Sequence, residues 1–132
     1  MSGSAAYLDT SAFMKLVMPE AESPALRAYL RQWRVRVAAT LLCTEALRTA
    51  GRASPARLPA VKRQLLGLVL IDLDRDLLFR AGTLAPRDLR SLDAVHVAAA
   101  LSLGDELGEL LTYDTRMAVA ARANGISVAS PA

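Results

Sequence analysis

Short apolar runs typical of buried β-strands alternate along this chain with segments of helical periodicity. Parallel strands are joined by crossover connections, usually helices, so this alternation predicts a mostly parallel sheet with helices on both faces. No repeat or linker interrupts the pattern, and the expected fold is a single α/β domain over residues 1–132. The five runs of strand character, of which the third is expected to be buried, are residues 5–9, 35–40, 68–71, 110–113 and 126–128.

The helices are predicted from apolar positions three or four residues apart and from residues that favour helix ends. Gly51 is expected to stop one helix, and Ser54 and Ser91 to cap two others. Asp114 is expected to cap the last helix, which ends at Gly125. The predicted helical segments are residues 12–18, 26–33, 42–50, 55–66, 72–85, 92–103 and 115–123.

Composition excludes several classes of protein. The longest apolar stretch, residues 65–71, is interrupted by Gly67 and is far shorter than the roughly 20 residues that cross a bilayer, so no membrane partner is expected. The start of the chain has no basic region with an apolar segment, so no secretory signal is expected there. The single cysteine, Cys43, suits a cytoplasmic protein and is expected to be a buried, inert thiol. A formal net charge of +3 is compatible with a polyanionic partner.

Acidic residues stand at the ends of the predicted strands. Asp9 ends the first run, Asp114 follows the fourth, and Glu45 lies in the first turn of the helix after the second. The carboxyl ends of parallel strands share one edge of a sheet, which is where ligands of α/β proteins bind. Asp93 lies in the first turn of its own helix and points to the same edge if that helix begins there.

Two explanations fit such acids. A single Asp at a strand-to-helix junction is more often a helix cap than a catalyst, and this holds for Asp9 or Asp114 alone. Four carboxylates at one edge resist ionising together unless a cation lies among them. Oxygen ligands select Mg²⁺ or Mn²⁺, and the sequence has no set of His and Cys ligands for zinc. Together the acids therefore predict a magnesium or manganese site.

Four segments carry a resemblance to a known family: residues 8–12 (LDTSA), 44–45 (TE), 92–96 (LDAVH) and 111–114 (LTYD). In their order, spacing and total length the chain resembles the PIN-domain ribonucleases, in particular the VapC toxins of bacterial toxin–antitoxin pairs. The resemblance covers essentially the whole chain. It implies a PIN-like three-layer α/β/α fold, Mg-dependent endoribonuclease activity that hydrolyses RNA phosphodiester bonds, a cognate antitoxin as partner, and a homodimer.

The resemblance also assigns roles to individual residues. It implies Asp9 and Asp93 as principal metal ligands, with Glu45 and Asp114 completing the catalytic metal site. Two hydroxyl residues match family positions that support these acids, namely Ser11 and Thr112. Arginines beside the acids are expected to contact flanking RNA phosphates, although for each one alone a solvated surface role is the plainer explanation. These arginines are Arg48, Arg52, Arg90 and Arg116.

Two residues outside this set, His96 and Trp33, have a simpler structural interpretation. His96 lies one helical turn after Asp93, and it is interpreted as a surface or packing residue because a metal-bound water needs no histidine base. Trp33 shares an apolar helical stripe with Tyr29 and Leu26 and is interpreted as core. The alternative for this stripe is partial exposure, where it would receive an antitoxin segment or a second subunit.

Two other functions are compatible with the sequence. Some members of the family carry a further acid after the last one, whereas Thr115 and Arg116 follow Asp114 here. The main alternative is therefore a PIN-like module that binds RNA or a partner with little or no nuclease activity. The second alternative is a magnesium-dependent phosphatase, although residues 9–11 (DTS) lack the second acid of the familiar aspartyl-phosphatase motif. No glycine-rich phosphate loop is present in the sequence.

Overall fold

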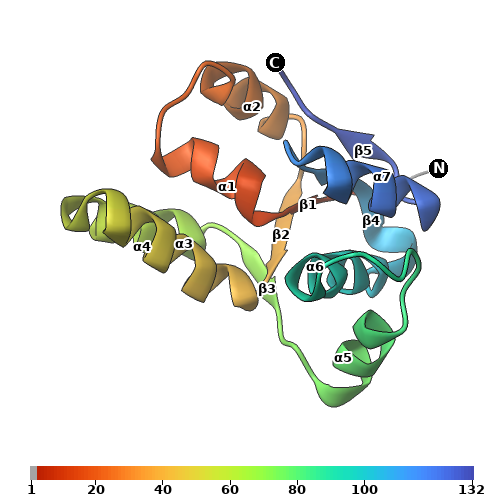
Figure 1. The fold of residues 1–132 in the computed structure, drawn as a ribbon. Helices are drawn as coiled ribbons and strands as arrows, with labels where there is room; N and C mark the ends of the chain where they lie inside the picture. The colour runs from red at the N-terminus through yellow and green to blue at the C-terminus, as the bar shows by residue number, and fades with distance from the viewer. Residues whose placement is uncertain (1–2) are drawn as a thin grey trace.

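A parallel five-stranded sheet runs through the protein, with helices on both of its faces (Figure 1). The computed structural model describes residues 3–132. The strands lie in the spatial order β3-β2-β1-β4-β5, and every pairing between neighbours is parallel, so their carboxyl ends share one edge. This confirms the predicted α/β class. The strands are β1 (Ala5–Leu8), β2 (Val35–Ala39), β3 (Val69–Ile71), β4 (Leu107–Leu111) and β5 (Val128–Ala129).

Two hydrophobic layers hold the helices to the sheet. One layer packs α1 to α4 on the face that carries Ala6 and Leu8 of β1, and the other packs α5 to α7 on the face that carries Ala5 and Tyr7. Alternate residues of β1 therefore belong to opposite cores, and all four are buried, as expected for a central strand covered on both sides. The helices are α1 (Thr10–Val17), α2 (Ser23–Leu30), α3 (Leu41–Ala53), α4 (Leu58–Leu66), α5 (Arg75–Gly82), α6 (Ser91–Leu101) and α7 (Thr115–Ala123), and short 3₁₀ turns cover Pro55–Arg57 and Gly104–Glu106.

Several predicted helix ends are wrong. Gly51 lies inside α3 and keeps a right-handed backbone, because the helix continues to Ala53 before it turns. Neither Ser54 nor Ser91 caps a helix through its side chain: a 3₁₀ turn follows Ser54, and Ser91 is itself the first residue of α6. By contrast, Gly125 does end α7, and its φ of 79° is the left-handed conformation that glycine adopts most easily.

The predicted strand bounds need two corrections. The third strand is not buried, because β3 stands at the edge of the sheet and pairs only with β2, which leaves Val69 57% exposed. The fourth strand begins earlier than expected and ends at Leu111, so Thr112 and Tyr113 form the loop that leads into α7. The strand therefore stops just where the acidic edge of the sheet begins.

The apolar stripe around Trp33 is divided between core and surface. Leu26 and Leu30 of α2 are fully buried, whereas Tyr29 and Trp33 are half-buried against the same core. Cys43 is also half-buried, rather than fully buried as expected, because it lies on the flank of α3. Within residues 3–132, no helix combines the length and the apolar character needed to cross a membrane.

Candidate active site

The candidate site lies at the edge of the sheet where the central strands end and helices begin. Asp9 is the first residue after β1 and the N-cap of α1. Asp114 follows β4 and is the N-cap of α7, and Glu45 lies one turn into α3, which follows β2. Asp93 is in the first turn of α6. Helix N-termini carry partial positive charge, so Asp9, Asp93 and Asp114 each gain about 0.3–1 kcal/mol there. Glu45 lies just beyond the first turn of α3, and not within it as expected, because that helix already begins at Leu41.

Asp9 is a buried carboxylate held entirely by neutral donors. Its side chain is 3% exposed, and its Oδ1 accepts hydrogen bonds from Ser11 Oγ at 2.7 Å and from the Ala12 amide at 3.0 Å. Its Oδ2 accepts from Thr112 Oγ1 at 2.5 Å. Burial raises the pKa of Asp9, and the hydrogen bonds oppose this rise without cancelling it. No Lys or Arg among residues 3–132 forms a salt bridge with it.

The hydroxyls of Ser11 and Thr112 join the ends of β1 and β4 around this carboxylate. Besides donating to Asp9, Ser11 Oγ accepts from the Tyr113 amide at 2.9 Å, and Thr112 Oγ1 accepts from the Asp114 amide at 3.0 Å. The two hydroxyl oxygens are 3.3 Å apart. The loop that carries Asp114 is therefore fixed to the same two hydroxyls that orient Asp9.

Glu45 belongs to a second hydrogen-bonded group beside Asp9. Its Oε1 accepts from Thr10 Oγ1 at 2.5 Å and contacts His96 Nε2 at 2.9 Å. Burial raises the pKa of Glu45, but the hydrogen bonds from His96 and Thr10 outweigh that effect and hold the pKa below its usual range. Glu45 therefore keeps its negative charge in a half-buried position.

The interpretation of His96 as a surface residue is wrong, whereas a packing role is confirmed by its burial against the Tyr7 ring. His96 is 2% exposed, and the other ring nitrogen, Nδ1, lies 2.7 Å from Tyr7 Oη. The signal in the sequence was its position one helical turn after Asp93, which places both side chains on the same side of α6. What the sequence could not show is that Glu45, 51 residues away, lies opposite the ring.

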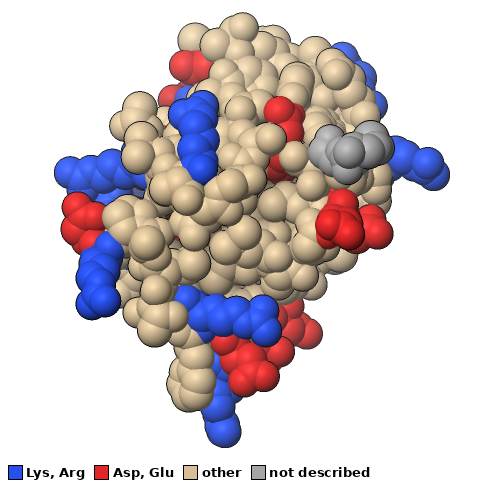
Figure 2. All heavy atoms as spheres, turned by 90° about the vertical axis from the view of Figure 1, so that its right-hand side faces the viewer, with Lys and Arg blue, Asp and Glu red and all other residues tan. Residues whose placement is uncertain are grey.

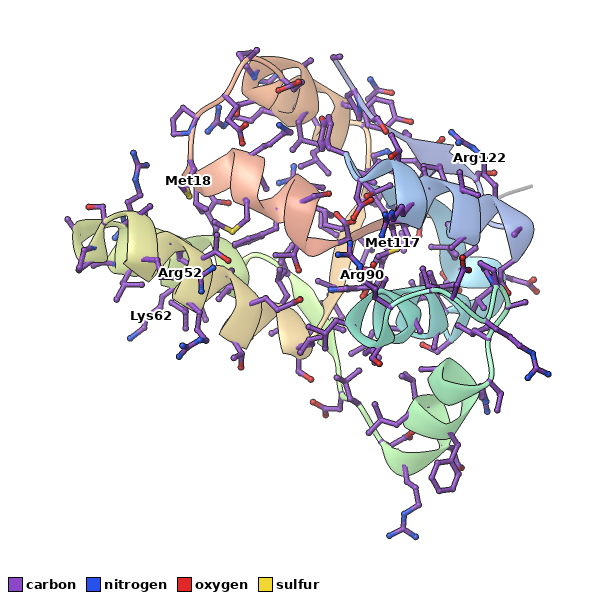
Figure 3. All side chains as sticks on the ribbon, in the orientation of Figure 1. Met18, Arg52, Lys62, Arg90, Met117 and Arg122 are labelled. Atoms are coloured by element: carbon purple, nitrogen blue, oxygen red, sulfur yellow. The ribbon has the colours of Figure 1, made fainter. Side chains whose placement is uncertain are left out.

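Asp93 and Asp114 share one guanidinium. Arg90 Nε lies 3.3 Å from Asp93 Oδ2, and Arg90 Nη2 lies 3.7 Å from Asp114 Oδ2. The other oxygen of Asp114 caps α7 by accepting from the amides of Arg116 and Met117. Figure 3 shows Arg90 at the centre of the molecule, between α6 and the start of α7. The expected cap role of Asp114 is therefore confirmed, and its second oxygen, Oδ2, faces the Arg90 guanidinium.

The four acids fit a divalent metal in ligand type but do not form a ready-made cage. No three His, Cys, Asp or Glu side chains within residues 3–132 are arranged to hold a metal ion. The acids are instead linked in steps: Thr112 connects Asp9 to the Asp114 backbone, and Arg90 bridges Asp114 to Asp93. Mg²⁺ commonly binds through one or two carboxylates and keeps several waters, so a cage of three is not required.

The remaining predicted arginines lie at different distances from this edge. Arg116, on the first turn of α7, lines an open hollow of about 420 Å³ together with Arg90 and Asp93. Arg48 is exposed on α3, one turn beyond Glu45, and Figure 3 shows Arg52 away from the centre, out along α3 and α4. The structure thus brings two of the four arginines to the acids.

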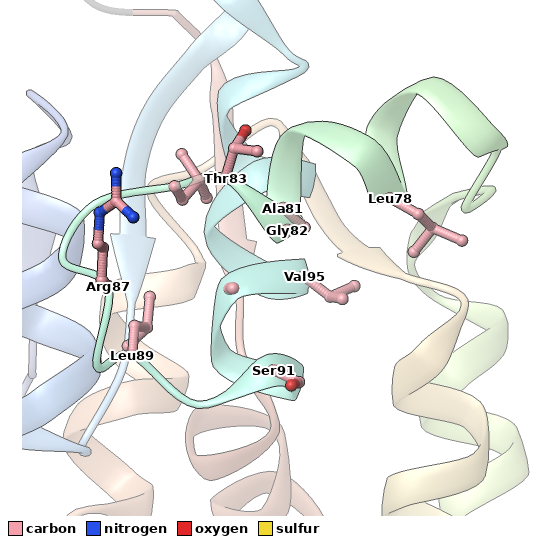
Figure 4. Close-up of a pocket in the computed structure, with 10 residues that line it drawn as sticks. Leu78, Ala81, Gly82, Thr83, Arg87, Leu89, Ser91 and Val95 are labelled. Carbon is pink, nitrogen blue, oxygen red and sulfur yellow. The ribbon is translucent and has the colours of Figure 1, made fainter.

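Two further surfaces lie away from the acids. A hollow of about 490 Å³ lies between α5 and α6 (Figure 4), and none of the four predicted acids lines it. On the face drawn in Figure 2, charged side chains are scattered and do not gather into a patch of one sign. Neither surface offers the concentration of oxygen ligands that the edge of the sheet provides.

Known proteins resemble this chain over nearly its whole length. The chain is 44% identical over 127 residues to Ribonuclease VapC46 of Mycobacterium tuberculosis, with 96% of this chain and 98% of that protein covered. It is 36% identical over 130 residues to Ribonuclease VapC47 of the same organism, with 95% and 96% covered.

Solved structures share the fold at much lower identity. The crystal structure of M. tuberculosis VapC20, described as a Sarcin-Ricin loop cleaving toxin, matches with a TM-score of 0.75 at 17% identity over 96% of this chain and 99% of that one. A toxin–antitoxin complex from Klebsiella pneumoniae matches with a TM-score of 0.74 at 19% identity, covering 96% and 98%. The PIN domain family model matches residues 6–123, which include every acid at the edge of the sheet. The chain therefore belongs to the PIN-domain family.

Proposed function

We propose that this PIN-domain protein is a metal-dependent endoribonuclease that acts as the toxin of a toxin–antitoxin pair. The observation that carries the proposal is Asp9, a buried carboxylate whose partners are all neutral, at an edge that three further acids approach. An ionised carboxylate in that position calls for a cation. Relatives of this chain at 44% and 36% identity are named ribonucleases, which supports RNA as the substrate.

Asp9 and Asp93 would be the principal ligands of Mg²⁺ or Mn²⁺, with Glu45 and Asp114 completing the site. A bound divalent cation lowers the pKa of a water ligand and stabilises the charge that develops on the phosphoryl and leaving oxygens. The chain's own part is positional. Ser11 and Thr112 orient Asp9, while Glu45 stays ionised and can accept a hydrogen bond or a proton from the attacking water.

The substrate would enter along the hollow lined by Arg90, Arg116 and Asp93. Both guanidiniums can hold phosphates on either side of the scissile bond, and Arg90 would exchange its carboxylate partners for phosphate when a metal ion takes the acids. Arg48 remains a candidate contact for RNA that extends beyond Glu45, and Arg52 is the weakest of the four because of its position along α3.

The same geometry suits inhibition by a protein partner. One guanidinium already bridges Asp93 and Asp114, which shows that the acids accept a basic side chain. An antitoxin that inserts an arginine or lysine here would displace Arg90 and compete with the metal ion. A homodimer is a further expectation, and light scattering on the purified chain tests it directly.

The test is cleavage of total RNA by the purified chain in Mg²⁺ and in EDTA. We expect cleavage only with the metal ion. In Asp93→Asn the cleavage rate should fall by about 100-fold or more, because removal of a principal ligand lowers both the affinity for the metal ion and the activation of its bound water. Arg122→Gln is the control, since Arg122 is exposed at the far end of α7, and it should cleave like the parent. An Asp93→Asn protein that cleaves at the parent's rate contradicts the proposal.

A binding module without nuclease activity is the second candidate. It is favoured by two observations: Thr115 and Arg116 stand where a further acid would lie, and Arg90 forms ion pairs with two of the four acids. Such a module would bind RNA equally well in EDTA and would show no turnover in Mg²⁺. Membership of the PIN-domain family leaves no support for the phosphatase alternative.

A further inference from the structure

We infer that His96 is a positioning residue that holds Glu45 in the active site, and this inference rests on the proposed function. His96 is buried on α6, and both of its ring nitrogens have hydrogen-bond partners from other elements. Nδ1 faces Tyr7 Oη of β1 at 2.7 Å, and Nε2 faces Glu45 Oε1 of α3 at 2.9 Å. A buried imidazole with two such partners is fixed in both position and orientation.

The partners determine where the ring carries its proton. Burial raises the pKa of Tyr7, so its phenol keeps the O–H and can donate to Nδ1. A ring that accepts at Nδ1 carries its hydrogen on Nε2, which therefore donates to Glu45. Thr10 donates to the same carboxylate oxygen at 2.5 Å. The hydrogen bonds thus run in one direction, from Tyr7 through His96 to Glu45.

Both donors reach the same oxygen of Glu45. Within residues 3–132, the hydrogen bonds from Thr10 and His96 end on Oε1, and none ends on Oε2. A carboxylate anchored through one oxygen presents the other in a defined direction. Oε2 is therefore the atom that Glu45 offers to a metal ion or to a metal-bound water, and His96 sets its position without touching either.

A purely structural role for His96 makes a different prediction. The ring also fills space between β1 and α6, where it packs edge-on against Tyr7 with ring centroids 5.9 Å apart. If packing were its only task, an apolar residue of similar volume would change stability and leave the affinity for metal ions unchanged. If it positions Glu45, the metal affinity falls even where the fold survives, because groups that orient metal ligands typically contribute 10–100-fold.

The test is the affinity of the RNA-free protein for Mn²⁺, measured by electron paramagnetic resonance or calorimetry. We expect His96→Leu to weaken Mn²⁺ binding about 10-fold and His96→Gln, which keeps an N–H near the Nε2 position, to recover most of it. In the double variant Glu45→Gln/His96→Leu, the affinity should equal that of Glu45→Gln alone, because His96 acts through Glu45. In cleavage assays, His96→Leu should lower kcat with little change in KM.

Two comparisons keep the test decisive if His96→Leu does not fold. Tyr7→Phe removes the donor to Nδ1 and keeps the ring, so Mn²⁺ affinity should fall a few-fold. Tyr29→Phe is its matched control, since the Tyr29 hydroxyl donates to Glu109 away from the acids. The inference would be overturned if the His96 and Tyr7 variants bind Mn²⁺ as tightly as the parent. It would also be overturned if the loss of Mn²⁺ affinity in the double variant equals the product of the losses in Glu45→Gln and His96→Leu. A parent chain that binds Mn²⁺ but does not cleave RNA would refute the proposed function. The Mn²⁺ affinities of the variants would still test whether His96 positions Glu45.

Discussion

Asp9 has two separable roles, and a pair of substitutions distinguishes them. As the N-cap of α1 it accepts from the Ala12 amide, and as a candidate metal ligand it supplies a buried negative charge. Asp9→Asn keeps the cap oxygen and loses the charge, whereas Asp9→Ala loses both. We expect both variants to lose RNA cleavage, because neither can bind a cation through an ionised carboxylate.

The two variants should differ in stability by about 2 kcal/mol. Loss of the cap costs about 1 kcal/mol. Ser11 and Thr112 would lose their acceptor in Asp9→Ala, which adds about 1 kcal/mol. This is the low end of the range because the two hydroxyl oxygens are 3.3 Å apart and one can donate to the other. In Asp9→Asn the side-chain amide can donate to Thr112 instead. For an m-value of about 2 kcal/mol per M, the urea midpoint of Asp9→Ala should lie about 1 M below that of Asp9→Asn.

The pH dependence gives a further check on Asp9. Its pKa in the folded protein is raised above the value of 3.8 that applies to the unfolded chain, and burial is the main cause. For an acid shifted in this direction, ionisation costs the folded state stability, so the metal-free parent loses stability as the pH rises above about 3.8. Asn does not ionise, so Asp9→Asn does not lose stability in this way. Its stability relative to the parent should therefore increase between pH 4 and pH 7 in EDTA.

Urea unfolding in EDTA, repeated at several pH values, and RNA cleavage in Mg²⁺ measure these effects. An Asp9→Asn protein that cleaves RNA at the parent's rate would refute the ligand role. Equal urea midpoints for the Asn and Ala variants would refute the cap and hydrogen-bond reasoning. If the stability of Asp9→Asn relative to the parent falls with rising pH, the surroundings of Asp9 stabilise its ionised form, and the reasoning from burial is wrong.

Arg90→Gln should change the unfolding free energy by less than about 0.5 kcal/mol because its ion pairs are largely exposed. The same substitution should lower the slope of log RNA affinity against log salt by about one, as measured by fluorescence anisotropy in EDTA. Glu22→Gln should lower the urea midpoint at pH 7, because hydrogen bonding to the buried Lys15 lowers the pKa of Glu22. That stability is present above pH 4.5 and disappears as the pH falls through the lowered value, so variant and parent should converge in acid. Gly108→Ala should destabilise the protein by about 1–3 kcal/mol, because overpacking in a full core carries such a cost. The added Cβ would overlap the Trp33 ring, so the tryptophan fluorescence should change as well.

The order of strands and helices could be read from the sequence because each local pattern agrees with its tertiary setting. Apolar runs such as Ala5–Leu8 are buried on both faces of a central strand, and no other element type accommodates them as well. The caps at Asp9 and Asp114 were also predictable, since they depend on amides two or three residues away. Gly51 failed as a stop signal, because α3 continues to Ala53. Ser54 and Ser91 do mark helix starts, although neither caps its helix through the side chain.

The sequence by itself also placed Asp9, Glu45 and Asp114 after strands that end at one edge of the sheet, because parallel strands share the edge at which their carboxyl ends lie. It could not determine what surrounds them. That Arg90 bridges Asp93 to Asp114, and that His96 donates to Glu45, depends on side chains from separate helices that only the folded chain brings within hydrogen-bond distance. The inaccessible state of Asp9, and with it the shift of its pKa, is likewise a product of its burial in the folded chain. Local sequence places the acids near the ends of strands and the starts of helices, whereas tertiary packing determines their hydrogen-bond partners and their ionisation.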